Sequence, residues 1–136
     1  MSTPKTFACH KIVRGNDAQW MLKHHITAQT HAIPADQKEG WIKKKLIEES
    51  GEVTTAHTHA KSLSELIDVQ EAIHALLHVW EISPETFEKM CQEKRNLRGS
   101  YKDAVLLTHV TLGEDNPHYA HYIHHPEKFI PIASQG

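Results

Sequence analysis

The chain has 136 residues, the length of a single domain, and 39% of them are apolar. This fraction is slightly low for a chain that must bury a large core alone, so it favours self-association. The net charge of −2 at pH 7 argues against a general nucleic-acid binder or a protein that adheres to anionic membranes. Thirteen histidines make the charge sensitive to pH near 6.

The cysteines and the apolar runs also narrow the class of protein. Cys9 and Cys91 make neither a disulfide framework nor a metal motif. No apolar run approaches the roughly 20 residues that span a bilayer, and the first residues lack the apolar core of a signal peptide. We therefore expect no membrane partner, no nucleic-acid polymer as partner, and a reducing cytoplasm as the location.

The first half of the chain is predicted to hold a short helix over residues 19–30 and a long helix over 37–57. Pro34 breaks the chain between them, and Asp36 is a candidate N-cap for the long helix. Gly51 in the interior of that helix lowers its helix propensity by ~1 kcal/mol. The apolar stripe of the long helix comprises Trp41, Ile42, Leu46, Ile47 and Val53.

A second long helix is predicted from Ser62 or Ser64 to Glu81. Its apolar residues cover well over half of the circumference, so it should be buried between neighbours rather than lie on a surface. These residues are Leu66, Ile67, Val69, Ile73, Leu76, Leu77 and Trp80. Ser83-Pro84-Glu85 reads as the start of a third helix that ends near Arg95.

The segment after the third helix is predicted to be different. Residues 104–112 are apolar and β-branched enough for a short strand, and the chain from Gly113 is loop-like with three prolines. The expected fold class is therefore all-α. It is a helical bundle in one domain, residues 1–136, with a core at about 8–105 and an extended tail at 106–136.

Acidic residues are the most informative feature of the two long helices. Glu49 and Glu52 share a face of the first helix because they lie three residues apart, and Glu65 and Asp68 do the same on the second. If the helices pack antiparallel, these pairs face each other, and a bound cation would relieve the repulsion between the four carboxylates. Mg²⁺ suits such oxygen ligands, with Mn²⁺ as the alternative. A solvated acidic face is the competing interpretation, and the Leu-Ile-rich setting of the second pair counts against it.

The same residues resemble a known family signature. Glu48-Glu49-Ser50-Gly51-Glu52, followed after twelve residues by Glu65-Leu66-Ile67-Asp68, is similar to the EExxE…ExxD motif of the all-α NTP pyrophosphatases, the MazG-like superfamily. Two outer segments resemble the small house-cleaning branch of that superfamily: Lys11-Ile12-Val13-Arg14 and Lys94-Arg95-Asn96-Leu97-Arg98-Gly99-Ser100-Tyr101. The likeness covers about residues 8–105. The chain departs from the branch at Gly15-Asn16, where Asp-Lys is usual, at Gly51, and in its tail.

The resemblance implies a MazG-type bundle and Mg²⁺-dependent hydrolysis of a nucleoside triphosphate between the α and β phosphates. The products would be a monophosphate and pyrophosphate, and the role would be house-cleaning of the nucleotide pool. The implied metal ligands are Glu49, Glu52, Glu65 and Asp68. Glu48 would be a further ligand or the base that orients water. Lys45 lies one turn before Glu49 and is the nearest cationic partner for the phosphates.

Further cations and aromatic residues are candidates for substrate binding. The cations are Lys11, Arg14, Lys94, Arg95 and Arg98. Tyr101 could stack on a base, whereas apolar packing is the expected role of Trp20 and Trp41. The expected partners are the nucleotide substrate and further copies of the chain, as a dimer or tetramer, because two amphipathic helices cannot cover their own apolar faces.

Three other interpretations compete with this function. The first is phosphoribosyl-ATP pyrophosphohydrolase activity, within the same superfamily. The second is a non-catalytic helical interaction module that binds metal for structural reasons. The third is a di-iron or di-manganese protein built on Glu71 and His74, whose spacing is typical of such bundles, although only one such motif is present. The tail histidines His118, His121, His124 and His125 could bind a transition metal, but composition alone supports this.

Overall fold

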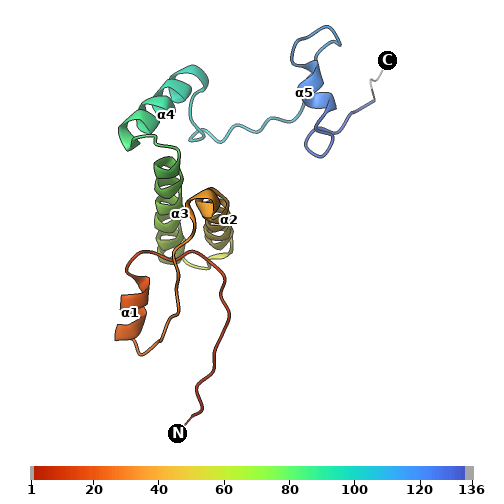
Figure 1. Cartoon of the computed structure of the whole chain (residues 1–136). Coiled ribbons are helices and arrows are strands. Elements are labelled where there is room, and N and C mark those ends of the chain that lie inside the picture. Colours follow the sequence, from red (N-terminus) through yellow and green to blue (C-terminus); the bar gives the residue numbers. More distant parts are fainter. Residues whose placement is uncertain (1, 134–136) are drawn as a thin grey trace. The chain divides into compact units, whose positions relative to one another are not determined.

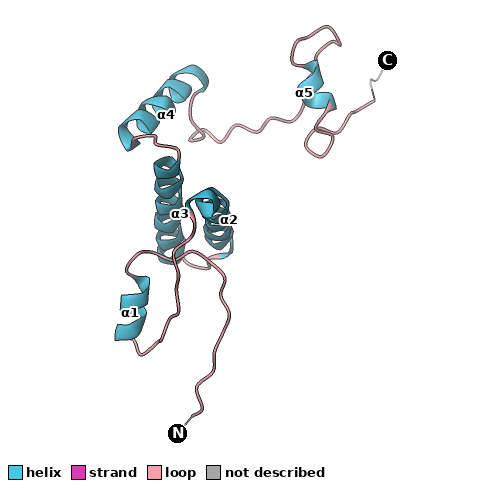
Figure 2. Cartoon of the chain, in the orientation of Figure 1, coloured by secondary structure: helices cyan, strands magenta, loops and turns pink. Residues whose placement is uncertain are grey.

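The structure is a computed structural model that describes residues 2–133. Within them the protein is all-α and has no strand (Figure 2). The helices are α1 (Asp17–Lys23), α2 (Lys38–Thr55), α3 (His59–Val79), α4 (Pro84–Arg98) and α5 (Tyr119–Ile123), with a 3₁₀ turn at Ala35–Gln37 before α2 (Figure 1). No described helix is long and apolar enough to cross a membrane. The chain divides into two compact units after Arg98.

The core of the first unit lies between α2 and α3, which pack side by side as a helical hairpin (Figure 1). Ile42 on α2 and a row on α3 are buried between them: Ala72, Leu76 and Leu77. The period of this row places buried side chains on the α2-facing side of α3. Glu49 follows Ile42 by seven residues, and Glu65 precedes Ala72 by seven. Both glutamates therefore occupy core-facing positions and are buried.

The ends of the helices follow local chemistry, and several differ from the sequence prediction. Thr58, not Ser62 or Ser64, caps α3, and its Oγ1 accepts a hydrogen bond from the backbone N–H of Lys61 at 3.0 Å. Asp36 lies in the 3₁₀ turn and is not a cap, because Gln37 precedes α2 without a side-chain capping bond. The predicted start of α4 is confirmed, with the Thr86 N–H bonded to Ser83 Oγ at 3.1 Å.

Two predicted elements are shorter or absent. The helix expected over 19–30 is α1, which ends at Lys23, and the chain is not helical from there to Pro34. The strand expected over 104–112 does not form. Its apolar side chains, such as Val105 and Leu106, are exposed, and in the described part of the chain no backbone partner pairs with residues 105–112. A strand needs a neighbouring strand to satisfy its backbone groups, so sequence preference alone is not sufficient here.

The second unit has a small aromatic cluster around α5. The rings of Tyr122 and Phe129 lie 4.6 Å apart between centroids, and that of His121 lies 5.3 Å from Phe129. His125 is hydrogen-bonded to Glu127 at 3.2 Å. His121 and His125 therefore take part in local packing and hydrogen bonding.

The chain leaves much apolar surface uncovered. On α3, Leu63, Leu66 and Ile67 are each at least half exposed. The sequence predicts a helix buried between neighbours, but α2 covers only one side of α3, so a second apolar face is left on the hairpin.

Candidate metal centre

Three carboxylates from α2 and α3 converge at the hairpin interface. One oxygen of Glu49, one of Glu65 and one of Asp68 all lie within 4.8 Å of one another. We call these residues the carboxylate cluster. Glu49 and Glu65 are about 95% buried, and Asp68 is half-buried. Carboxylates this close repel one another and favour either protons or cations.

Each member of the carboxylate cluster is paired with one basic side chain. Lys45 Nζ lies 2.8 Å from Glu49 Oε1, Lys61 Nζ lies 3.2 Å from Glu65 Oε1, and Arg14 Nη2 lies 2.7 Å from Asp68 Oδ1. Burial lowers the pKa of Lys45, but its bonds to Glu49 and the charge of Glu48 outweigh this and raise it overall. The cations come from the N-terminal segment and from both helices, and they offset the repulsion within the cluster.

One oxygen of the cluster lacks a partner. Glu49 Oε2 is buried and accepts no hydrogen bond from the described residues, although the side chain of Glu49 is only 6% exposed. A buried acceptor without a partner costs about 1–3 kcal/mol, and more when it is charged. The other oxygen of Glu49 already binds Lys45. The neighbouring carboxylates of Glu65 and Asp68 are acceptors too and cannot donate a hydrogen bond to this oxygen. A metal cation could bind it instead.

Glu52 lies one helical turn after Glu49, and its pKa responds to the carboxylates of the cluster. Hydrogen bonding to Glu65, with burial and the proximity of Glu49, raises the pKa of Glu52 from 4.5 to about 7. The pKa of Glu65 is lowered, chiefly by the hydrogen bond from Glu52 and then by Lys61. A cation at the cluster would displace this shared proton and free the Glu52 carboxylate as a fourth ligand.

Glu48 is directed elsewhere. Its two oxygens lie 3.4 Å from Lys11 Nζ and 3.4 Å from Lys45 Nζ, and it is not a member of the carboxylate cluster. Neighbouring positions on a helix point about 100° apart, which explains why Glu48 and Glu49 separate. Glu48 therefore forms ion pairs with Lys11 and Lys45 beside the cluster and does not lie among the candidate metal ligands.

The other predicted site residues are not all brought together. Lys11, Arg14 and Lys45 join the site through the ion pairs above. No ion pair in the described residues joins the cluster to the predicted cations of α4, Lys94, Arg95 and Arg98; Arg95 Nη1 instead donates to Gln92 at 2.7 Å. Tyr101 belongs to the second unit and is fully exposed.

The competing sites receive little support from geometry. His74 Nε2 lies 3.1 Å from the amide nitrogen of Gln70, and Glu71 is approached by Arg14 at 3.9 Å. Trp20 stacks on His24, and Trp41 lies under Lys44. Among residues 2–133, the carboxylate cluster is the one group of three or more acidic, histidine or cysteine side chains close enough to share an ion.

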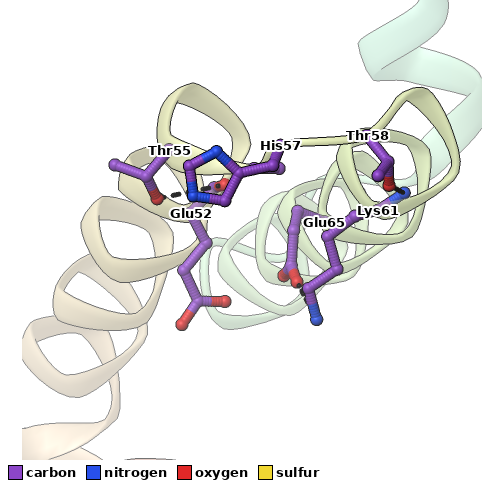
Figure 3. Close-up of a pocket in the computed structure, with 7 residues that line it drawn as sticks. Glu52, Thr55, His57, Thr58, Lys61 and Glu65 are labelled. Carbon is purple, nitrogen blue, oxygen red and sulfur yellow. Dashed lines mark hydrogen bonds and ion pairs between the residues drawn. The ribbon is translucent and has the colours of Figure 1, made fainter.

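A pocket that the sequence did not predict lies beside the cluster. It occupies about 540 Å³ where the α2–α3 connection turns, and we call it the turn pocket. Figure 3 shows Glu52 on α2 and, across from it on α3, Glu65 with Lys61 beside it. The other labelled lining residues are Thr55, His57 and Thr58. Lys61 precedes Glu65 by one turn, a spacing that could have pointed to it.

The chain matches no protein-family model, no curated protein and no solved structure.

With metal removed, the free energy of unfolding is expected to fall as the pH rises from about 4.5 to about 7. The pKa of Glu52 is raised to about 7, so between these values the folded state keeps a proton that the unfolded state has released. This contribution is fully present below 4.5 and is lost as the pH passes the folded value. The lowered pKa of Glu65 acts only below 4.5, where acidification removes its contribution.

Urea unfolding in EDTA at about pH 5 and about pH 8 measures this difference. Glu52→Gln is the control, because it removes the titrating group and should reduce the pH dependence. An identical pH dependence in wild type and variant would contradict the shared proton.

Proposed function

We propose that this chain is a Mg²⁺-dependent nucleoside triphosphate pyrophosphohydrolase of the MazG-like type, which cleaves between the α and β phosphates. The observation that carries the proposal is the buried Glu49, which has an unpartnered Oε2 and forms a cluster with the carboxylates of Glu65 and Asp68. These residues belong to the two halves of the EExxE…ExxD pattern. They are separated in sequence, and the α2–α3 hairpin brings them together.

The donor set fits a hard divalent cation. Glu49, Glu65 and Asp68 would hold the metal, with Glu52 as the fourth carboxylate after it loses its proton. The ligands are all oxygens, and no histidine or cysteine joins the cluster in the described residues, which favours Mg²⁺ or Mn²⁺ over zinc. A bound Mg²⁺ supplies charge neutralisation for the phosphates and lowers the pKa of a bound water.

The chain's own cations would orient the substrate. Lys45 and Arg14 already reach the cluster at 2.8 and 2.7 Å, so both lie where phosphate oxygens bridging to the metal would come. Glu48 holds Lys45 and Lys11, which supports a positioning role more than a role as general base. Within residues 2–133 no ion pair joins the cluster to Lys94, Arg95 or Arg98. The part of these residues and of Tyr101 in substrate binding rests on the resemblance alone.

We also infer that the active form contains more than one copy of the chain. Leu63, Leu66 and Ile67 form an exposed apolar face on α3, the same helix that carries Glu65 and Asp68. A second hairpin packed on this face would complete a four-helix bundle and would bury surface that the single chain leaves in water.

The test is pyrophosphate release from a panel of ribo-, deoxy- and damaged nucleoside triphosphates, with Mg²⁺, with Mn²⁺ and with EDTA. We expect release with at least one nucleotide, dependent on metal, with the monophosphate as the second product. Mg²⁺ should also stabilise the EDTA-treated protein, by about 2.7 kcal/mol at 100 times its dissociation constant. Release of orthophosphate instead of pyrophosphate would contradict the proposed bond cleavage, and metal-dependent stability without turnover would favour a non-catalytic module.

A further inference from the structure

The turn pocket is lined by groups of both charges. The acidic groups are Glu65, a member of the carboxylate cluster, and Glu52, which comes from the other helix (Figure 3). Lys61 and His57 provide the basic groups, and His57 lies in the turn itself. A volume of about 540 Å³ falls within the roughly 300–1,000 Å³ typical of small-molecule pockets. Such a pocket suits an anion that binds both the basic groups and a metal ion held by the carboxylate cluster.

Lys61 is the basic group that can change partners. Its side chain is 66% exposed, and its Nζ binds a single carboxylate, Glu65, at 3.2 Å. Lys45 differs, because it is only 22% exposed and two carboxylates hold it. A divalent cation on Glu65 would neutralise the charge that attracts Lys61. The flexible stem of a lysine then leaves its ammonium free to turn toward another anion in the pocket.

The start of α3 adds to the positive potential of the turn pocket. α3 runs for 21 residues from His59, and its first turn adjoins the pocket through Thr58 and Lys61. The N-terminus of a helix carries about half a positive charge and free N–H groups in its first turn. Thr58 accepts from the Lys61 N–H, but the backbone N–H groups of His59 and Ala60 have no acceptor among the described residues.

We propose that the turn pocket is an anion subsite for the pyrophosphate part of the substrate, with Lys61 as its principal side chain. With metal on the carboxylate cluster, Lys61 leaves Glu65 and binds phosphate oxygens together with the first turn of α3. The substrate would lie with its β and γ phosphates toward the α2–α3 turn. This assignment rests on the proposed function, because the pyrophosphate is the product that the enzyme would release.

Isothermal titration of inorganic pyrophosphate into the full chain with saturating Mg²⁺ tests the subsite. We expect Lys61→Gln to weaken pyrophosphate binding about tenfold or more, and Lys61→Arg to retain most of it. Lys43→Gln is the matched control, because Lys43 is also an exposed helical lysine paired with a glutamate four residues away, Glu39, outside the pocket. This control should change the affinity less than twofold.

A separate Mg²⁺ titration without pyrophosphate distinguishes the subsite from an effect on the metal. Lys61→Gln should bind Mg²⁺ at least as tightly as wild type, because a competing cation has been removed. Unchanged pyrophosphate affinity in Lys61→Gln, or an equal loss of Mg²⁺ affinity, would overturn the assignment. The proposed function is judged separately. Lys61-dependent pyrophosphate binding without turnover of any nucleotide would keep the subsite and reject the enzyme, whereas turnover without a Lys61 effect would do the reverse.

Discussion

Glu52→Gln is expected to lower kcat by about 1,000-fold, equivalent to about 4 kcal/mol of transition-state stabilisation, while making the metal-free protein more stable above pH 7. The two effects have one cause. Hydrogen bonding to Glu65 and the proximity of Glu49 raise the pKa of Glu52 to about 7, so ionised Glu52 is unfavourable without metal. The neutral amide removes this repulsion, but it also removes a charged oxygen ligand for the proposed Mg²⁺.

Steady-state pyrophosphate release and thermal unfolding in EDTA at about pH 8 measure the two effects. Glu88→Gln on α4 is the control, because Glu88 is exposed and makes no ion pair with the described residues. It should leave turnover and stability unchanged. Wild-type turnover by Glu52→Gln would remove Glu52 from the site, and a lower stability in EDTA would contradict the repulsion between the carboxylates.

The positions of the acidic residues could be predicted because they depend on helix period alone. Spacings of three residues placed Glu65 and Asp68 on one face of α3, and the structure brings both to Glu49. Sequence could not show that Glu52 would lie at the edge of this group or that Glu48 would turn away to Lys11 and Lys45. Those details depend on how α2 and α3 are rotated against each other in the hairpin, which no local sequence pattern specifies.

The failures concern contacts made across the chain. Residues 104–112 have the composition of a strand, but strand formation needs a partner that the described chain does not provide. The place of the basic motif from Lys94 to Arg98 at the site stays a prediction from the resemblance, because nothing local determines where α4 directs these side chains. Lys61 was overlooked because a lysine four residues before a glutamate is common on any exposed helix. Only its position beside the turn pocket distinguishes it.

Ile67→Glu is expected to dissociate the assembly that we infer. Ile67 is 59% exposed in the single chain and lies one turn after Leu63 on the uncovered face of α3. A charge there would have to be buried between two hairpins, where a central interface substitution typically costs at least about 2 kcal/mol. The dissociation constant should therefore rise about 30-fold or more.

Size-exclusion chromatography with light scattering over a range of concentrations measures this change. Leu97→Glu is the control, because Leu97 is an even more exposed leucine on α4 and should leave the molar mass unchanged. A monomeric wild type would reject the assembly. An Ile67→Glu variant with the wild-type mass would place the interface elsewhere. An Ile67→Glu variant that is monomeric and still releases pyrophosphate would show that turnover does not need the assembly.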